Sequence, residues 1–166
     1  PTISADGRFV AFWSNATNLV AGDNNDVADA YFHYRNNAPE CEAGYADPGV
    51  LWPANHKFRD VSIVGVSDPD GDSITVTNTS IMHDESTSGK GNSNNCPDGE
   101  IVGVNAAKLL AERSGNGDGR VYHLTFSAED TLGVACTKAV TVCVPHDQSN
   151  PVCGDQGPLF DSLVCN

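Results

Sequence analysis

Hydrophobic and polar residues alternate in short runs along most of this chain. Alternation with a period of two turns one side of a strand toward a core and the other toward water, so it is typical of half-buried β-strands. Gly, Asn and Asp separate the runs, as expected of turns. The pattern predicts strands over residues 9–13, 30–34, 61–66, 73–78 with a continuation to Ile81, 121–128 and 139–144.

The spacing of these runs predicts an all-β fold. Residues 51–150 are expected to form an antiparallel β-sandwich of immunoglobulin-like kind. Within them, residues 86–100 are rich in Ser, Gly and Asn and predict a loop, whereas residues 105–112 fit a helix or a strand. Residues 38–50 are interrupted by Pro and Gly and predict a linker, and residues 151–166 predict an irregular, disulfide-stapled tail.

The first 37 residues form a separate unit of two predicted strands around a turn-rich loop. They resemble a single repeat of a TolB-like β-propeller. The stretches that carry the resemblance are Ile3-Ser4-Ala5-Asp6-Gly7-Arg8-Phe9-Val10-Ala11-Phe12, Ser14-Asn15-Ala16-Thr17-Asn18-Leu19-Val20 and Gly22-Asp23-Asn24-Asn25, followed by Asp29. The resemblance implies a propeller-like β segment appended to the sandwich.

A single propeller blade is physically incomplete. Blades bury their faces against neighbouring blades, and one blade alone leaves strand edges and apolar faces uncovered. Residues 1–37 are therefore expected to pack on the rest of this chain or to donate a strand to another copy by β-augmentation.

The second unit carries a second resemblance. Leu51-Trp52-Pro53-Ala54-Asn55-His56-Lys57 resembles the Leu-Trp-Pro-Pro-Asn-His-Lys signature of a module of secreted bacterial proteins, with Ala54 in place of the second Pro. Further matching stretches are Ala111-Glu112-Arg113-Ser114-Gly115, Gly119-Arg120-Val121-Tyr122 and Val144-Pro145-His146-Asp147. The resemblance spans roughly residues 50–150. It implies a secreted accessory or structural role and assigns no catalytic residue.

The charge balance narrows the possible partners. The chain has 22 acidic and 9 basic residues, a formal net charge of −13. Such a surface has little with which to neutralise phosphates, which argues against nucleic acids and anionic membranes. No stretch approaches the roughly 20 apolar residues of a membrane span. An acidic surface attracts cations, and it favours partners that bind through bridging cations.

The cysteines indicate an oxidising compartment. An even number of cysteines in a chain rich in Asn, Gly and Asp predicts an extracellular or cell-surface protein with disulfides. The six are Cys41, Cys96, Cys136, Cys143, Cys153 and Cys165. Their spacing matches no zinc site and allows many pairings. Pairing of Cys153 with Cys165 is favoured because both lie in the short tail. Cys136 and Cys143 are an odd number of residues apart on one predicted strand, so they face opposite sides and are not expected to pair.

The absence of a signal-peptide pattern and of an initial Met leads us to expect a processed form or a piece of a longer protein.

Asp68-Pro69-Asp70-Gly71-Asp72 is the strongest candidate for a binding site. Three carboxylates at alternate positions in a tight turn repel one another unless a cation lies among them, and Ca²⁺ prefers hard oxygen ligands in flexible loops. The sequence is not an EF-hand, because Ser73 and Thr79 occupy the positions of its Gly and Glu. The alternative is a solvated acidic turn.

Other acidic loops are weaker candidates for calcium. Asp23, Asn25 and Asp29 offer oxygens at positions 1, 3 and 7 of a loop, although an Asn/Asp turn explains them equally well.

Two further groups of candidate calcium ligands come together only if the fold places them side by side. Asn116 and Asp118 lie in a hairpin-type turn that Glu112 could join. Asp84 and Glu85 follow the strand after the triple-Asp turn. Either residue could return to that turn and complete its calcium site, and a polar turn explains them equally well.

Catalytic motifs are missing. There is no His-Glu-x-x-His zinc motif and no Gly-x-Ser-x-Gly nucleophile elbow. With 22 acidic residues, chance carboxylate pairs are expected, so a hydrolase is the third choice. Trp13, Trp52, Tyr31 and Tyr34 are candidates for core packing or for a sugar-stacking platform.

We therefore expect a non-catalytic, calcium-stabilised extracellular subunit that assembles with copies of itself into a bacterial fibre or surface layer. The alternative is a carbohydrate-binding or adhesive module of a larger secreted enzyme, with a polysaccharide as its partner.

Overall fold

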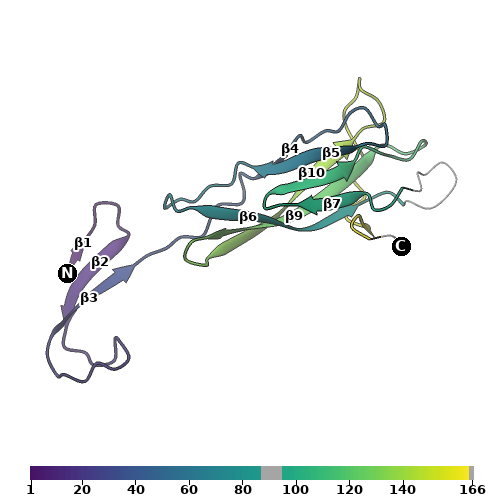
Figure 1. Cartoon of the computed structure of the whole chain (residues 1–166). Helices are drawn as coiled ribbons and strands as arrows, with labels where there is room; N and C mark the ends of the chain where they lie inside the picture. The colour runs from purple at the N-terminus through teal and green to yellow at the C-terminus, as the bar shows by residue number, and fades with distance from the viewer. Residues whose placement is uncertain (87–94, 165–166) are drawn as a thin grey trace. The chain divides into compact units, whose positions relative to one another are not determined.

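The computed structural model describes residues 1–86 and 95–164. It divides into two compact units, Pro1–Asn37 and Ala38–Asn166, which are described separately below (Figure 1). All regular elements in the described ranges are β-strands, and the strands pair antiparallel. No helix long and apolar enough to cross a membrane occurs in those ranges. The all-β prediction is therefore confirmed.

The first unit is a three-stranded sheet in the order β1-β2-β3. The two predicted strands correspond to β2 (Phe9–Ser14) and β3 (Asp29–Tyr34). The additional strand β1 (Thr2–Ile3) has only two residues, which is too short to show an alternating pattern, so it could not be predicted. The turn from β1 to β2 passes through Gly7, whose positive φ of 74° suits glycine.

The second unit contains two four-stranded sheets. One has the order β10-β9-β6-β11, formed by Ala135–Val144, Arg120–Asp130, Ile74–His83 and Phe160–Asp161. The other has the order β4-β5-β8-β7, formed by Tyr45–Asp47, Phe58–Val64, Ala106–Leu110 and Gly99–Val102. The predicted strands 61–66, 73–81, 121–128 and 139–144 lie within or overlap β5, β6, β9 and β10.

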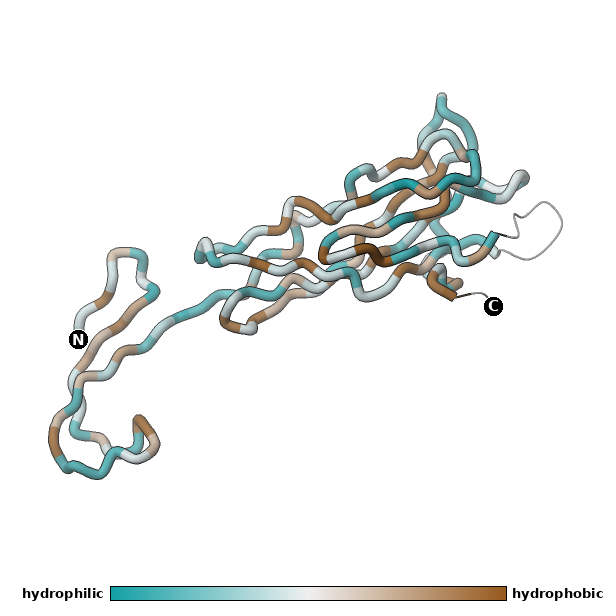
Figure 2. The backbone as a smooth tube through the Cα atoms, viewed as in Figure 1, coloured by the Kyte–Doolittle hydropathy of each residue, from teal (hydrophilic) through white to brown (hydrophobic). Residues whose placement is uncertain are grey.

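The two sheets share one hydrophobic core. Tyr122, Leu124 and Phe126 alternate along β9 and are fully buried, and Val61 and Leu109 of the other sheet belong to the same cluster. Apolar and polar residues alternate along these strands (Figure 2). A period of two places one side of each strand in the core. Two sheets around one core are compatible with the predicted β-sandwich.

Residues 38–50, predicted as a linker, are instead part of the second unit. They contain β4, which pairs with β5, and Glu40 forms a bridge with Ser67. Cys41 and Ala46 are buried. Two isolated buried apolar positions between prolines are too few to produce a recognisable strand pattern, so this part of the fold is not visible in the sequence.

The two ambiguous segments also have defined places. Residues 105–112 contain the strand β8 and no helix, with Ala107 and Leu109 in the core. The tail forms the short strand β11 on the edge of β6. In the predicted loop 86–100, residues 87–94 lie outside the described residues, and its last two belong to β7.

The predicted pairing of Cys153 with Cys165 is wrong, because Cys153 is bonded to Cys143. The chain turns back after β10, and the Cβ of a residue other than Gly119 would lie 2.7 Å from the Cys153 sulfur. The glycine thus permits the tail to approach this closely. Cys165 lies outside the described residues.

The second disulfide joins Cys41 to Cys136, and Cys96 is disulfide-bonded as well. Cys136 and Cys143 have different partners, as their opposite faces predicted.

The two disulfides should differ in their contribution to stability. The Cys41–Cys136 bond closes a loop with a sequence separation of 95, whereas the Cys143–Cys153 separation is 10. Because a longer loop loses more entropy on closure, we expect replacement by alanine pairs to lower the free energy of unfolding by about 4.7 and 2.7 kcal/mol, respectively. Equilibrium urea unfolding of the two double variants measures the difference. A larger loss for the Cys143–Cys153 pair would contradict this ranking.

Candidate functional site

The triple-Asp turn between β5 and β6 brings its three carboxylates together. One oxygen from each of Asp68, Asp70 and Asp72 lies within 4.8 Å of the others. The Asp68 carboxylate organises the turn, since its Oδ1 accepts hydrogen bonds from the backbone N–H groups of Asp70 (2.7 Å) and Asp72 (3.3 Å). Gly71 adopts a positive φ of 77°, which lets the chain reverse here.

The donor set of this turn fits calcium. Asp68 Oδ2 is buried and has no hydrogen-bond partner among the described residues, so it is an oxygen for which a cation would compensate. The three side chains are half-buried, and all would offer hard oxygen ligands. Asp68, Asp70 and Asp72 are the residues that could hold Ca²⁺.

Asp84 and Glu85 do not complete this site. They follow the far end of β6, a strand of 10 residues that spans about 33 Å at 3.3 Å per residue. Asp84 is buried there and accepts hydrogen bonds from the backbone N–H groups of Val121 (2.8 Å) and Gln156 (3.3 Å). The prediction failed because β6 continues to His83 instead of turning back.

The loop Asp23–Asp29 is held by its own hydrogen bonds. Asp23 Oδ2 accepts a hydrogen bond from the Tyr31 hydroxyl (2.9 Å), and this bond raises the pKa of Tyr31. Asn25 Oδ1 accepts one from the backbone N–H of Val27 (3.2 Å). Calcium binding by Asp23, Asn25 and Asp29 stays a prediction.

Glu112 does not join the turn that contains Asn116 and Asp118. Its side chain is fully buried and its oxygens contact other groups, described below. Asp118 Oδ2 instead accepts a hydrogen bond from the Gln156 amide (3.3 Å).

A buried ion cluster surrounds Arg120, and it was not predicted from the sequence. The guanidinium of Arg120 has no exposed surface. It lies 2.9 Å from Asp98 Oδ2, 3.4 Å from Glu85 Oε2 and 3.6 Å from Glu112 Oε1. It also donates a hydrogen bond to the Tyr122 hydroxyl (3.3 Å). A signal existed, because Arg120 occupies the inward register of β9 two residues before Tyr122.

Burial changes the protonation of two groups in this cluster. Desolvation raises the pKa of Asp98 to about 6, although Arg120 opposes the shift. Desolvation and then the charge of Arg120 lower the pKa of His83 to about 4. His83 is therefore neutral at pH 7, with Nδ1 2.7 Å from the Ser162 hydroxyl and Nε2 3.7 Å from Asp98 Oδ2.

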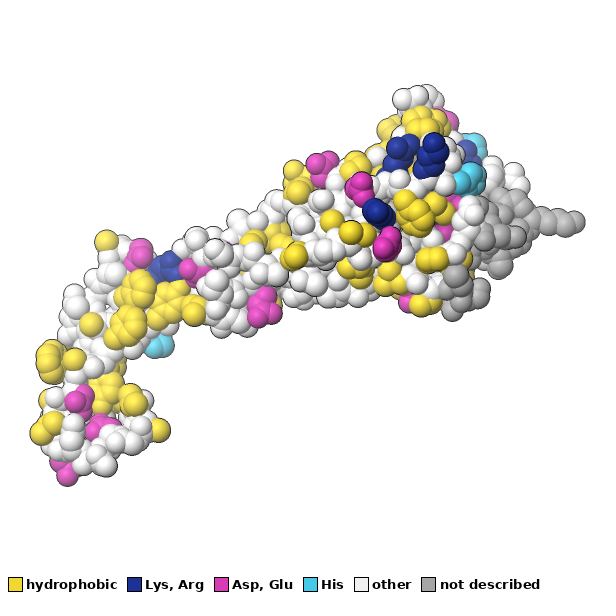
Figure 3. Space-filling model, in the orientation of Figure 1, with side chains coloured by type: hydrophobic (Ala, Val, Ile, Leu, Met, Phe, Trp, Pro, Cys, Tyr) yellow, Lys and Arg dark blue, Asp and Glu magenta, His cyan; other side chains and the backbone are white. Residues whose placement is uncertain are grey.

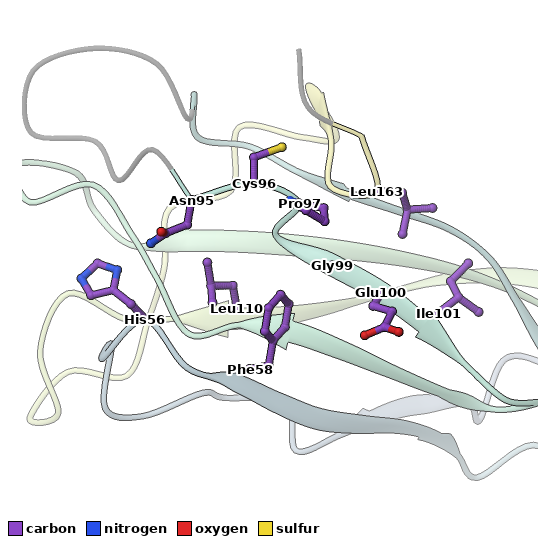
Figure 4. Close-up of a pocket in the computed structure, with 10 residues that line it drawn as sticks. All are labelled: His56, Phe58, Asn95, Cys96, Pro97, Gly99, Glu100, Ile101, Leu110 and Leu163. Atoms are coloured by element: carbon purple, nitrogen blue, oxygen red, sulfur yellow. The ribbon is translucent and has the colours of Figure 1, made fainter.

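A pocket of about 670 Å³ lies beside the ion cluster (Figure 4). Glu112 connects the two, since its Oε2 accepts a hydrogen bond from the Asn95 amide (2.8 Å) and lies 3.2 Å from His56 Nδ1. His56 has a φ of 57°, which is uncommon for a residue other than glycine. The lining residues are His56, Phe58, Asn95, Cys96, Pro97, Gly99, Glu100, Ile101, Leu110 and Leu163.

No protein-family model, curated protein or solved structure matched this chain. The functional argument therefore depends on the residues themselves.

Asp98 and His83 give the stability of the protein opposite dependences on pH. The folded-state pKa of Asp98 lies above its ordinary value of 3.8, so its contribution is fully present below pH 3.8 and is lost as the pH rises through about 6. The folded-state pKa of His83 lies below its ordinary value of 6.5, so its contribution is fully present above pH 6.5 and is lost as the pH falls through about 4. The two dependences offset each other in the native chain.

Asp98→Asn and His83→Gln should reveal these dependences separately. Between pH 4 and pH 7, the stability of the native chain relative to Asp98→Asn should fall by about 3 kcal/mol, and its stability relative to His83→Gln should rise by about 3 kcal/mol. Urea unfolding at intervals of one pH unit measures both differences. The double variant is the control and should differ from the native chain by an amount nearly independent of pH. If the differences in free energy of unfolding did not change with pH for either single variant, the account would be contradicted.

Proposed function

We propose that this protein is a non-catalytic structural subunit of an extracellular bacterial fibre or surface layer. Its second unit is an immunoglobulin-like β-sandwich, stabilised by disulfides and by calcium. Its first unit joins one copy to the next, because its β-sheet is completed by a strand from another copy. The observation that carries the proposal is an exposed apolar face on the sheet of the first unit, whose one charged neighbour among the described contacts is the Arg8 guanidinium over the Tyr34 ring.

The register of the strands defines this apolar face. Residues directly opposite each other in antiparallel strands have their side chains on the same face of the sheet. The face contains Phe9, Ala11 and Trp13 of β2 together with Tyr34, Phe32 and Ala30 of β3. Thr2 of β1 pairs with Ala11 and adds no charge.

Large aromatic groups of the apolar face are open to solvent. Trp13 is 75% exposed, Phe32 67% and Phe9 38%. Phe9 stacks on Phe32 with ring centroids 5.6 Å apart, so these two rings form one patch on the same sheet face as Trp13. Figure 3 shows hydrophobic side chains gathered on this unit. Contiguous exposed aromatic groups are typical of interaction surfaces, because their burial removes apolar area from water.

The sheet also has the smallest number of strands that can be stable without a partner, and one of the three is very short. β1 contains two residues, and β3 is an edge strand whose outer backbone groups can pair with another strand. A small sheet becomes stable when further strands or a second layer cover it. A further copy of the chain offers β-strands and exposed edges of its own, which supports assembly by strand complementation.

Charge and disulfides support the calcium and extracellular parts of the proposal. Like charges on subunits with a net charge of −13 repel one another, and a divalent cation bound by Asp68, Asp70 and Asp72 reduces this repulsion. The disulfides suit an oxidising compartment. The alternative role predicted from the sequence, carbohydrate binding, is favoured by a different feature, the pocket beside Glu112.

Trp13→Lys should weaken self-association. A lysine removes the most exposed aromatic ring of the apolar face and places a charge there, so we expect the association constant to fall at least tenfold. Sedimentation velocity over a range of concentrations with millimolar calcium measures the change. Leu132→Lys, at an exposed apolar position of the second unit, is the matched control and should associate like the native chain. A native chain that stays monomeric at high concentration, or a Trp13→Lys variant that associates normally, would refute the proposal.

Calcium should raise the thermal stability of the second unit through the triple-Asp turn. At a free calcium concentration one hundred times Kd, binding stabilises the folded state by about 2.7 kcal/mol, which corresponds to an increase in Tm of about 5–10 °C. Asp70→Asn and Asp72→Asn should each reduce this increase, whereas the control Asp47→Asn, at an exposed position of β4, should retain it. Differential scanning calorimetry with calcium and with EGTA tests this. An increase in Tm that is the same in all variants would exclude the turn as the site.

A further inference from the structure

We propose that the pocket between β5, β7 and residues 95–97 binds a neutral sugar ring of a polysaccharide. The inference is independent of self-assembly, since it depends on the second unit alone. The pocket has a volume of about 670 Å³, which falls within the range of binding sites for small molecules. The lining combines an apolar floor with a few polar side chains, which is the usual composition of such sites.

The floor of the pocket offers a surface on which a sugar can stack. Phe58 of β5 pairs directly with Leu110 of β8, so their side chains lie on the same face of the sheet. Leu110 is 4% exposed, whereas Phe58 is 45% exposed and presents its ring to solvent. The face of an aromatic ring carries partial negative charge and attracts the weakly positive C–H groups of a pyranose.

Polar side chains lie on both sides of this floor. Figure 4 shows His56 and Asn95 on one side of Phe58 and Leu110, and Glu100 on the other. Imidazole, amide and carboxylate groups provide both donors and acceptors. Hydroxyl groups also donate and accept, so a ring with hydroxyls at its edge matches this arrangement.

Two of these side chains are held in position before a ligand arrives. Glu112 is fully buried, and its Oε2 contacts both the Asn95 amide and the His56 ring. Arg120 lies 3.6 Å from the other oxygen of Glu112 and thereby holds the carboxylate in turn. Because these groups are already ordered, binding loses less conformational entropy.

The charges around the pocket favour a neutral ligand. Glu100 lines the pocket and repels carboxylate and sulfate groups of anionic polysaccharides. Lys108 of β8 is directly opposite both Glu100 and Asp60, so this row of side chains alternates in sign. The lysine offsets one of these two negative charges and so weakens the attraction for an organic cation. A polyhydroxylated, uncharged ring is not repelled by Glu100 and does not need a strong acidic field in order to bind.

A glycan microarray of neutral, anionic and amino-sugar glycans tests the proposal. The probe protein should be the full chain with Trp13→Lys, so that self-association does not create apparent binding through avidity. We expect binding to a set of neutral glycans. Adding Phe58→Ala should weaken it at least tenfold, because the stacking surface is lost. Glu100→Gln should also weaken binding while it leaves the apolar floor intact. Phe32→Ala, an exposed Phe of the first unit, is the matched control and should bind normally.

The possible outcomes separate this inference from the assembly proposal. Thermal unfolding checks whether Phe58→Ala is folded, and Glu100→Gln provides a second variant if it is not. Binding to neutral glycans that both variants weaken would support the pocket, whether or not the native chain assembles. Absence of binding to every neutral glycan, preference for charged glycans, or full binding by both variants would overturn the inference.

Discussion

The fold of the second unit depends on the carboxylates that compensate the buried positive charge of Arg120. Arg120 is wholly enclosed, and a guanidinium in that position requires carboxylates as partners. They come from three separate parts of the chain: Glu85 after β6, Asp98 before β7 and Glu112 after β8. Removing one member of such a cluster leaves uncompensated buried charge, a loss of about 3–5 kcal/mol. The cluster thus connects the ends of both sheets, and through Glu112 it also positions His56 and Asn95 at the pocket.

The two units differ in how completely they bury their apolar residues. In the second unit, a continuous core joins both sheets and disulfides fasten its early and late segments to β10. In the first unit, the largest aromatic side chains of one sheet face remain open. One unit has a packed core, and the other has a sheet with one uncovered apolar face. We expect this combination in a subunit whose first unit connects it to the next copy and whose second unit is a stable domain.

Local patterns predicted the strands well and the ion cluster poorly. The alternation around Tyr122 and Phe126 reflects the strand itself, so it was visible in the sequence. The partners of Arg120 could not be inferred, because Glu85 is far away in sequence and meets it through the pairing of β6 with β9. Glu112 is close in sequence but follows β8 of the other sheet, so its approach depends on how the two sheets pack. The pairing of Cys143 with Cys153 was missed for a similar reason, since it depends on how closely the tail passes Gly119. The triple-Asp turn, by contrast, is a local arrangement, and its carboxylates converge as their spacing predicted.

The central claim is that the open sheet of the first unit is covered by another copy of the chain, with calcium reducing the repulsion between subunits. Negative-stain electron microscopy of the native protein with millimolar calcium, repeated after chelation with EGTA, tests it most directly. The account predicts regular filaments or sheets with calcium that thin or dissolve after chelation. Assemblies that are indifferent to EGTA would contradict the role of calcium, and single particles under both conditions would contradict self-assembly itself.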